Sequence, residues 1–390
     1  MDKKLDRFLG LNNVGDPLTL SLGHLATADN VDITDAGKPT PRAGYDLTAA
    51  GAVTGAYGTL DHQRMLYVID GSLTVMDGAV VIATGLAGDR MHWAEVNEQI
   101  YYSNGTDYGI VDAINSPRAW AWPVPSAPTL AAVTGNLAPG KYEVCCTYVF
   151  EDGRETGSGI AASLEISEGQ ALQISNIPQA EGMTTLVYIA PANSTVFQLA
   201  YRGRTGAAVW NHGPNALGRN LTTFGLDPVP PGDVIQFWGG RMYVAQHFPS
   251  QLQPMSAIWK SLSLTPHLFD MSTDMAAVAG RSLMMAPTPS ALLIGTDTHI
   301  YALNNDGLVT LATYGVVPGC CWAIDDEDPD KRVLFWTQRG LCRGMPFENL
   351  MADRVSVAPG LSAGAAVIAK GGQKRFVVAL HEGGIAFNQR

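Results

Sequence analysis

The sequence predicts an all-β protein, a β-propeller of about six blades with a small β-sandwich domain inserted into it. Three observations lead to this fold class. A strand–turn–strand pattern recurs along the chain. The 42 glycines and 23 prolines among 390 residues suit many turns and few helices. The apolar period of a helix is hard to find beyond short stretches. Because a lone hairpin is barely stable in water, the repeated hairpins are expected to stack their apolar faces on one another.

The clearest copy of the pattern is Arg332–Gly344, an apolar run, a break at Arg339–Gly340 and a second short run. Aromatic and β-branched residues fill pleated strands, and glycine supplies the turn. Five looser copies are Met65–Asp77, Gln99–Asp112, Arg241–Leu262, Ala291–Leu303 and Arg375–Asn388. Their starts lie mostly 34 to 50 residues apart, a period that favours propeller blades.

Residues 1–50 do not fit the repeat and are interpreted as an N-terminal arm. Val31 and Ile33, followed by Gly37, predict a strand and a tight turn. Such an arm could pack along another surface. It could also close the ring by adding a strand to the last blade, which would remove two exposed sheet edges.

Scattered residues at both ends of the chain form a recognisable pattern. It reads F-x-G-x-N-N, a proline and a Leu-rich stretch, A-x-N-V-D-I-T-x-x-G-K, then P-R-x-G-Y. These positions are Phe8, Gly10, Asn12, Asn13, Pro17, Ala28, Asn30 to Thr34, Gly37, Lys38, Pro41, Arg42, Gly44 and Tyr45, with Trp336–Gly340 and Gly372–Arg375 near the other end. The pattern resembles a family of tailed-bacteriophage structural proteins, the β-propeller hub or nozzle proteins at the distal end of short tails. The resemblance implies a virion protein and includes no catalytic signature.

Residues 51–121 are expected to form the first part of the propeller. Tyr67 to Ile69 lead into Asp70-Gly71, a favoured hairpin turn. In the second copy, Ile100 to Tyr102 lead into Asn104-Gly105, the strongest short-range hairpin signal in the chain.

A stiff connector then breaks the pattern at Pro123, Pro125 and Pro128. Beyond it, four runs are expected to be strands: Lys141–Phe150, Leu164–Ile166, Leu172–Ile177 and Thr185–Ala190. Even spacing over about 75 residues favours a small β-sandwich. The runs at 127–130, 139–142 and 151–156 are similar to a fibronectin type III module. Residues 122–204 are therefore interpreted as a domain inserted between the second and third blades.

Residues 205–390 are expected to form the second part of the propeller. A Gly- and Pro-rich return linker covers 205–232, and Val234–Trp238 with Arg241–Ala245 restart the strands. The remaining copies begin at 291, 332 and 375. A seventh blade could lie in 205–232 or in the first 60 residues.

Composition and charge limit the classes of protein to which this chain could belong. Hydrophobic residues make up 46% of the chain and charged residues 16%, enough for a large core. The formal net charge is −11, which disfavours a protein that grips nucleic-acid phosphates through Lys and Arg. No apolar run approaches the length of a membrane span. The N-terminal stretch lacks a signal-peptide core, so a protein made and folded in a cytoplasm is expected.

The five cysteines are expected to be buried free thiols rather than a metal or redox site. They are Cys145, Cys146, Cys320, Cys321 and Cys342. Neighbours on a strand point to opposite faces, so an adjacent pair cannot share one partner surface. No Cys-x-x-Cys spacing is present to suggest a metal ligand set.

Several motifs suggest chemistry but are better explained by structure. Gly135–Lys141 matches phosphate-loop spacing, but Tyr142 stands where a Ser or Thr should hold magnesium, and a strand follows instead of a helix. The acidic run Asp325–Asp330 lacks calcium-loop spacing and is interpreted as a solvated loop. Asn104, Asn193 and Asn220 fit the glycosylation pattern but are interpreted as turn residues.

Histidines and tryptophans give no site either. The eight histidines are scattered, and His92 and His299 are interpreted as wall or core residues. Most aromatic residues are expected to pack between blades. Trp120 and Trp122 flank the connector, where exposed rings could anchor the inserted domain or a neighbouring subunit. We therefore predict no catalytic residue, no cofactor and no metal site.

The expected function is structural. The chain would form a homo-oligomeric ring, possibly a hexamer, around the DNA exit channel of a phage tail. It would dock adaptor or fibre proteins, bind no specific DNA sequence, and be assembled in the host cytoplasm. An alternative is a carbohydrate-active or carbohydrate-binding propeller, with an aromatic-lined pocket on its axis and two facing carboxylates. A host-side adaptor that binds proteins is a third possibility, which the phage-like ends disfavour.

Overall fold

The computed structural model describes residues 7–381 except 35, 43, 45–49, 62, 77–79, 204, 251, 320–321, 325–329 and 371–372. Within these residues the regular elements are strands, apart from 3-10 turns such as η2 at Pro214–Ala216. The all-β class predicted from the sequence is thereby confirmed. No helix in this part of the chain is long and apolar enough to span a bilayer.

Five sheets are each built from strands that follow one another in the chain, and each strand pairs with the next. The first holds β5 (Val53–Gly58), β6 (Met65–Ile69), β7 (Ser72–Val75) and β8 (Val80–Ala83). The second holds β9 (His92–Val96), β10 (Gln99–Ser103), β11 (Tyr108–Val111) and β12 (Pro117–Arg118). The third holds β20 (Val234–Trp238), β21 (Arg241–Phe248), β22 (Met255–Leu262) and β23 (Thr265–Phe269), with β24 (Met275–Ala279) also on β22.

The later sheets continue this order. The fourth holds β25 (Ser282–Pro287), β26 (Leu292–Thr296), β27 (Ile300–Asn304) and β28 (Gly307–Ala312). The fifth holds β29 (Trp322–Ile324), β30 (Val333–Thr337), β31 (Gly340–Gly344) and β32 (Glu348–Asn349). A two-stranded sheet follows, β33 (Ser362–Lys370) with β34 (Gln373–His381).

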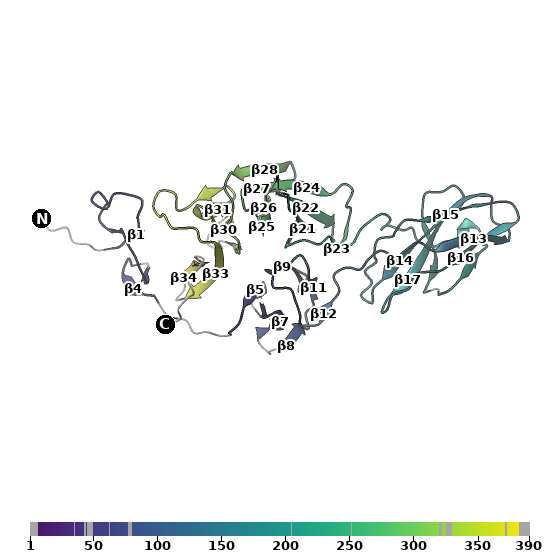
Figure 1. The fold of residues 1–390 in the computed structure, drawn as a ribbon, viewed down its shortest axis with the longest axis horizontal. Helices are drawn as coiled ribbons and strands as arrows, with labels where there is room; N and C mark the ends of the chain where they lie inside the picture. The colour runs from purple at the N-terminus through teal and green to yellow at the C-terminus, as the bar shows by residue number, and fades with distance from the viewer. Residues whose placement is uncertain are drawn as a thin grey trace. The chain divides into compact units, whose positions relative to one another are not determined.

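Two further sheets lie between β12 and β20 in the sequence and share one core (Figure 1). One has the order β13-β16-β19, from Thr129–Thr134, Gln170–Ser175 and Ala208–Trp210. The other has the order β15-β14-β17-β18, from Ala162–Ile166, Gly140–Val149, Thr184–Ala190 and Gln198–Arg202. Leu172 of the first sheet and Val144 of the second belong to the same buried cluster. We call this two-layer body the sandwich. Its last strand, β19, lies beyond the domain boundary expected at residue 204.

The chain divides into two compact units. One comprises Met1–Trp93, His247–Ala257 and Ala277–Arg390; the other, which contains the sandwich, comprises Ala94–Gln246 and Ile258–Ala276. Each has its own apolar clusters. In the first, Phe335 and Leu293 are fully buried, and in the second Trp120 and Phe269 are buried in a single cluster.

The hairpins expected from the sequence are found in five of six positions as hydrogen-bonded neighbouring strands. The sixth differs. Residues 375–381 belong to β34, which pairs with the preceding β33 from Ser362↔His381 to Lys370↔Gln373. The return run expected at 385–388 lies outside the described residues.

Turn chemistry decides the registers of the hairpins. Asp70 and Gly71 both have positive φ, 48° and 72°, as a two-residue hairpin loop requires. The break expected at Arg339–Gly340 is displaced by one residue. Thr337 pairs with Gly340, so the loop is Gln338–Arg339, and Gly340 begins β31 with φ +91°.

The N-terminal arm holds four short strands that, in the described residues, pair only with one another. These are β1 (Gly10–Leu11) with β2 (His24–Leu25), and β3 (Val31–Ile33) with β4 (Pro39–Pro41). The strand and turn expected at 31–37 are confirmed. The expected ring-closing strand is not seen in this part of the chain, where the two prolines of β4 cannot donate to a sheet ladder. A 2.7 Å ion pair joins Asp32 to Arg375 of β34 instead.

Candidate functional site

Arg154 lies where the sandwich meets the second sheet, and its position follows from the turn that ends β14. The strand stops at Val149, and the amide of Gly153 donates to the carbonyl oxygen of Phe150. Gly153 has φ +86°, which glycine adopts without strain. Asp152 accepts from the amide of Arg154 at 3.1 Å and from its Nε at 2.8 Å. The turn therefore fixes one side of the Arg154 guanidinium.

The other side of that guanidinium binds the connector. Nη1 of Arg154 donates to the carbonyl oxygen of Trp120 at 2.7 Å, and Nη2 donates to that of Ala119 at 2.9 Å. Its Cζ lies 4.6 Å from the centre of the Phe150 ring, a cation–π contact. Arg154 thus ties the sandwich turn to the segment that leads out of β12.

Trp120 holds the same segment against the third sheet. Its indole is 1% exposed, and Nε1 donates to the carbonyl oxygen of Pro266 at 2.9 Å. The ring makes an edge-on contact with Tyr101, with centroids 5.1 Å apart. The prediction that this ring is exposed is therefore wrong. The ring fills the core around β10 and β21 instead. Trp122 is 39% exposed and packs edge-on against Phe150.

Glu155, the next residue, carries a carboxylate that is 10% exposed and has three side-chain partners. Its Oε1 accepts from the Thr147 hydroxyl at 2.6 Å and from the Tyr188 hydroxyl at 2.8 Å. Its Oε2 forms an ion pair with Arg219. Burial, followed by the hydrogen bond to Glu155, raises the pKa of Tyr188, so that phenol stays a donor.

His267 of β23 connects the third sheet to the sandwich turn, and we call this region the junction. Its Nε2 lies 3.2 Å from the carbonyl oxygen of Glu155, which requires the proton on Nε2. Nδ1 is buried without a hydrogen-bond partner among the described residues. Burial and the nearby Arg154 lower the pKa of His267 to about 4, so the imidazole is neutral at pH 7.

We expect acid to weaken this junction through His267. The folded pKa, about 4, lies below the unfolded value of about 6.5, so the folded state resists protonation. Stability from this residue is full above pH 6.5 and falls progressively as the pH drops toward 4, by up to about 3 kcal/mol. Urea unfolding of wild type and His267→Gln at about pH 7.5, 6, 5 and 4 measures the difference.

His92 has its pKa lowered to about 3 by burial, Arg90 and Arg281, so it contributes to the same acid window. The comparison with His267→Gln removes that shared contribution. Replacing the exposed His212 by Gln controls for loss of an imidazole elsewhere in the same unit. If wild type and His267→Gln lose stability in parallel between pH 6.5 and 4, the explanation is wrong.

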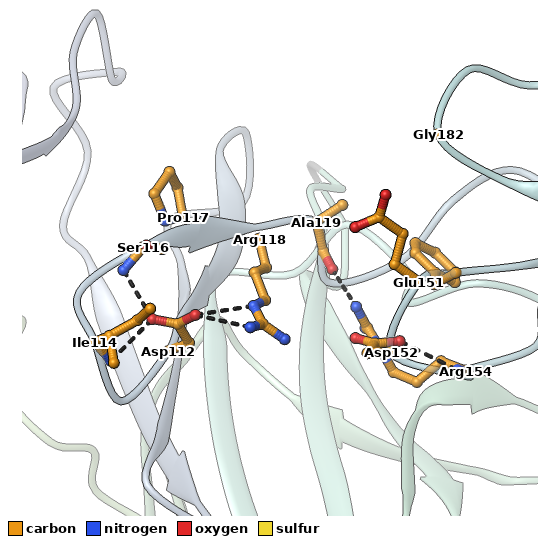
Figure 2. Close-up of a pocket in the computed structure, with 11 residues that line it drawn as sticks. Asp112, Ile114, Ser116, Pro117, Arg118, Ala119, Glu151, Asp152, Arg154 and Gly182 are labelled. Atoms are coloured by element: carbon orange, nitrogen blue, oxygen red, sulfur yellow. Dashed lines mark hydrogen bonds and ion pairs between the residues drawn. The ribbon is translucent and has the colours of Figure 1, made fainter.

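An open groove of about 590 Å³ lies beside this junction. Figure 2 shows its two walls, the loop between β11 and β12 on one side and the sandwich turn on the other. Asp112 organises the first wall. Its Oδ1 accepts from the amides of Ile114 and Ser116 at 3.0 and 2.8 Å, and its Oδ2 accepts from Arg118 Nε at 3.0 Å. Burial acts to raise the Asp112 pKa, but these bonds outweigh it and hold that pKa below its ordinary value.

The second wall is formed by Phe150, Glu151, Asp152 and Arg154, with Gly182 at one end. Glu151 has no hydrogen-bond or ion-pair partner in the part of the chain that the structure describes, and its carboxylate points into the open (Figure 2). The groove therefore offers charged groups of both signs on fixed walls, but no nucleophile beside a base. No group of three or more possible metal ligands occurs among the described residues.

The phosphate-loop-like run and the described cysteines have the structures that the sequence predicts. Gly135 to Pro139 joins β13 to β14, which begins at Gly140, so the expected turn before a strand is confirmed. Cys145, Cys146 and Cys342 are buried free thiols, as expected. Cys145 and Cys146 belong to different clusters, which confirms their opposite faces, and burial raises the pKa of each to about 12.

Some of the sequence-based predictions concern residues that the structure does not describe. Cys320, Cys321, His62, Tyr45, Gly372 and residues 325–329 of the acidic run lie outside the described residues. Asn193 has φ +56° and Asn104 caps a four-residue hairpin loop, as turn residues do. His299 is half-buried at a hairpin end, beside Thr298. Sequence reasoning did not single out Arg118, Arg154 or Glu155. Arg154 and Glu155 lie in the run at 151–156, a concentration of charge directly after the long strand β14, whereas Arg118 gave no signal.

Comparison with known proteins places the chain in no family. No family model matches it, and no curated protein matches it. Among solved structures, it is similar to the crystal structure of Kluyvelomyces marxianus Hsv2. That similarity has 9% sequence identity and a TM-score of 0.21, covering 85% of this chain and 97% of the other. A similarity this weak defines neither the fold nor the function.

Proposed function

We propose that this chain is a structural protein of a short phage tail, a nozzle or hub subunit built on a β-propeller of about six blades. The observation that carries the proposal is the series of five sheets made of consecutive strands, followed by the β33–β34 pair. Each sheet would be one blade, and the sandwich would be a fibronectin type III-like domain inserted between the second and third. The resemblance of residues at both ends of the sequence to phage tail proteins supports a position in a tail.

The N-terminal arm supports a role in assembly. Leu9, Leu18 and Leu22 are large apolar residues, and all three are more than half exposed. Ordering an arm costs about 1–2 kcal/mol per residue, and these side chains recover little of it within one chain. A neighbouring copy in a ring, possibly a hexamer, would cover them. Adaptor and fibre proteins would dock on the ring.

The overall charge fits a channel through which DNA passes. With a net charge of −11, the chain has few cations to spare for phosphates. Affinity for DNA rises with the number of phosphates that Lys and Arg neutralise. An acidic wall would let a genome leave without trapping it, and no enzymatic step is part of this proposal.

Quantitative mass spectrometry of purified virions tests the proposal. In virions of a phage that encodes the chain, the protein should be present at a fixed stoichiometry with the other tail proteins. Negative-stain electron microscopy of the full recombinant chain should show closed rings, alone or with tail partners. Absence of the chain from virions would rule out the tail function.

A further inference from the structure

The groove between the β11–β12 loop and the sandwich turn has the construction of a binding site. Its volume, about 590 Å³, falls in the range that small-molecule sites occupy. Its polar side chains are held in place before any ligand arrives. Asp112 holds Arg118 through Nε and Nη2, both at 3.0 Å, and Arg154 is held by Asp152 and two carbonyl oxygens. Binding here would cost little side-chain ordering.

The groups that remain available to a ligand are a donor on one wall and acceptors on the other. Arg118 uses one edge of its guanidinium for Asp112, which leaves Nη1 toward the groove (Figure 2). Across the groove, Glu151 presents a carboxylate, and Asp152 adds a second that is shared with Arg154. Ile114 and Pro117 on the first wall and Phe150 on the second supply apolar surface.

An extended peptide could not pair with β12 through a series of backbone hydrogen bonds. The strand β12 lies at the edge of its sheet, where an extended peptide could in principle add by backbone hydrogen bonds. Pro117 has no amide hydrogen to donate. The carbonyl oxygens of Ala119 and Trp120 are already bound by Arg154. A ligand of this groove must therefore be recognised by side chains.

An anionic ligand would also be disfavoured. The lining carries three carboxylates, Asp112, Glu151 and Asp152, against two guanidinium groups, Arg118 and Arg154. Both guanidinium groups already face a carboxylate. A phosphate or a uronic acid would meet Glu151 without a cation left to balance it.

We propose that this groove binds a neutral oligosaccharide. A hydroxyl group can accept from Arg118 and donate to Glu151, so vicinal hydroxyls match the two walls at once. The C–H faces of successive sugar rings would lie on Phe150 of one wall and on Ile114 of the other. The site does not depend on the tail function proposed above, because a sugar could be bound by this chain in any assembly.

The test uses the full chain and a panel of short neutral oligosaccharides of glucose, galactose, mannose and rhamnose, with matched sugars that contain uronic acids. Isothermal titration should find at least one neutral sugar with a dissociation constant near or below about 1 mM. Binding should change less than twofold between low and high salt, because no net charge is exchanged (roughly 50 to 500 mM, where exposed charges become screened).

Variants locate the site. Arg118→Lys keeps the charge but loses the planar fork, and should weaken binding about tenfold. Glu151→Gln, which touches no other described residue through a hydrogen bond, should weaken it about fivefold. Glu165→Gln, on the exposed side of β15, is the matched control and should leave affinity unchanged. Unaltered urea unfolding shows that each variant is folded.

Three outcomes would overturn the proposal. One is that no neutral sugar in the panel binds. Another is that a sugar binds equally well to Arg118→Lys and Glu151→Gln. The third is a preference for uronic acids or for an unstructured peptide over every neutral sugar. Virion mass spectrometry is independent of all three, so this site and the tail function can fail separately.

Discussion

Trp120→Ala should destabilise the unit that contains the sandwich by about 4 kcal/mol, within the range for removing a buried Trp side chain. The indole is 1% exposed and packs with Met242, Val244 and Phe269. Its loss leaves a cavity between the second and third sheets. It also removes the donor to Pro266, whose carbonyl oxygen loses its 2.9 Å bond. Hydrogen exchange measured by mass spectrometry should show faster exchange in β10 and β21 than in wild type.

The control for that experiment is the neighbouring tryptophan. Trp122 is 39% exposed and packs edge-on against Phe150, so Trp122→Ala should cost about 1 kcal/mol or less. Strands β26 and β30, in the other unit, serve as an internal reference for exchange. Equal exchange of β10 in the two variants would contradict the role given to Trp120.

Local patterns explain how much of the fold the sequence could predict. Hairpin runs such as Met65–Asp77 depend on neighbours in the chain, and the structure contains them. The same holds for the long strand at 141–150 and for the opposite faces of Cys145 and Cys146. Alternation and turn residues are enough for such features. The one-residue error at Gln338–Arg339 shows where this reasoning ends, because several residues near that turn could have begun the return strand.

The junction and the groove depend on pairs that are distant in sequence. Arg154 binds a carbonyl oxygen 34 residues away, His267 reaches back 112 residues to Glu155, and Trp120 reaches forward 146 residues to Pro266. Arg154 and Glu155 lie in the fibronectin-like run at 151–156, but that run does not predict these contacts. A tryptophan beside prolines could equally be an exposed anchor or a core residue. Only the packing of the third sheet against the connector decides in favour of the core.

Glu155 is the shared acceptor of a hydrogen-bond network. Glu155→Leu should therefore lower the free energy of unfolding of the unit that contains the sandwich by about 3–4 kcal/mol. The change removes a side chain that is 10% exposed. It leaves the hydroxyls of Thr147 and Tyr188, both fully buried residues, without this acceptor. It also leaves Arg219 without its carboxylate partner. An apolar side chain of similar volume keeps the packing, so the loss reports the hydrogen bonds and the ion pair. Urea unfolding and hydrogen exchange of β14 and β17 measure it.

A graded series separates the network from its surroundings. Tyr188→Phe deletes one donor and should cost about 1 kcal/mol, because the carboxylate keeps Thr147 and Arg219. Glu165→Leu, at an exposed position on β15, should change stability by about 0.5 kcal/mol or less. If Glu155→Leu proved no worse than Glu165→Leu, the carboxylate would contribute no net stability. In that case the cost of desolvating the ion pair would cancel its attraction. The two stranded hydroxyls argue for the larger loss, because in the variant they stay buried and have no acceptor.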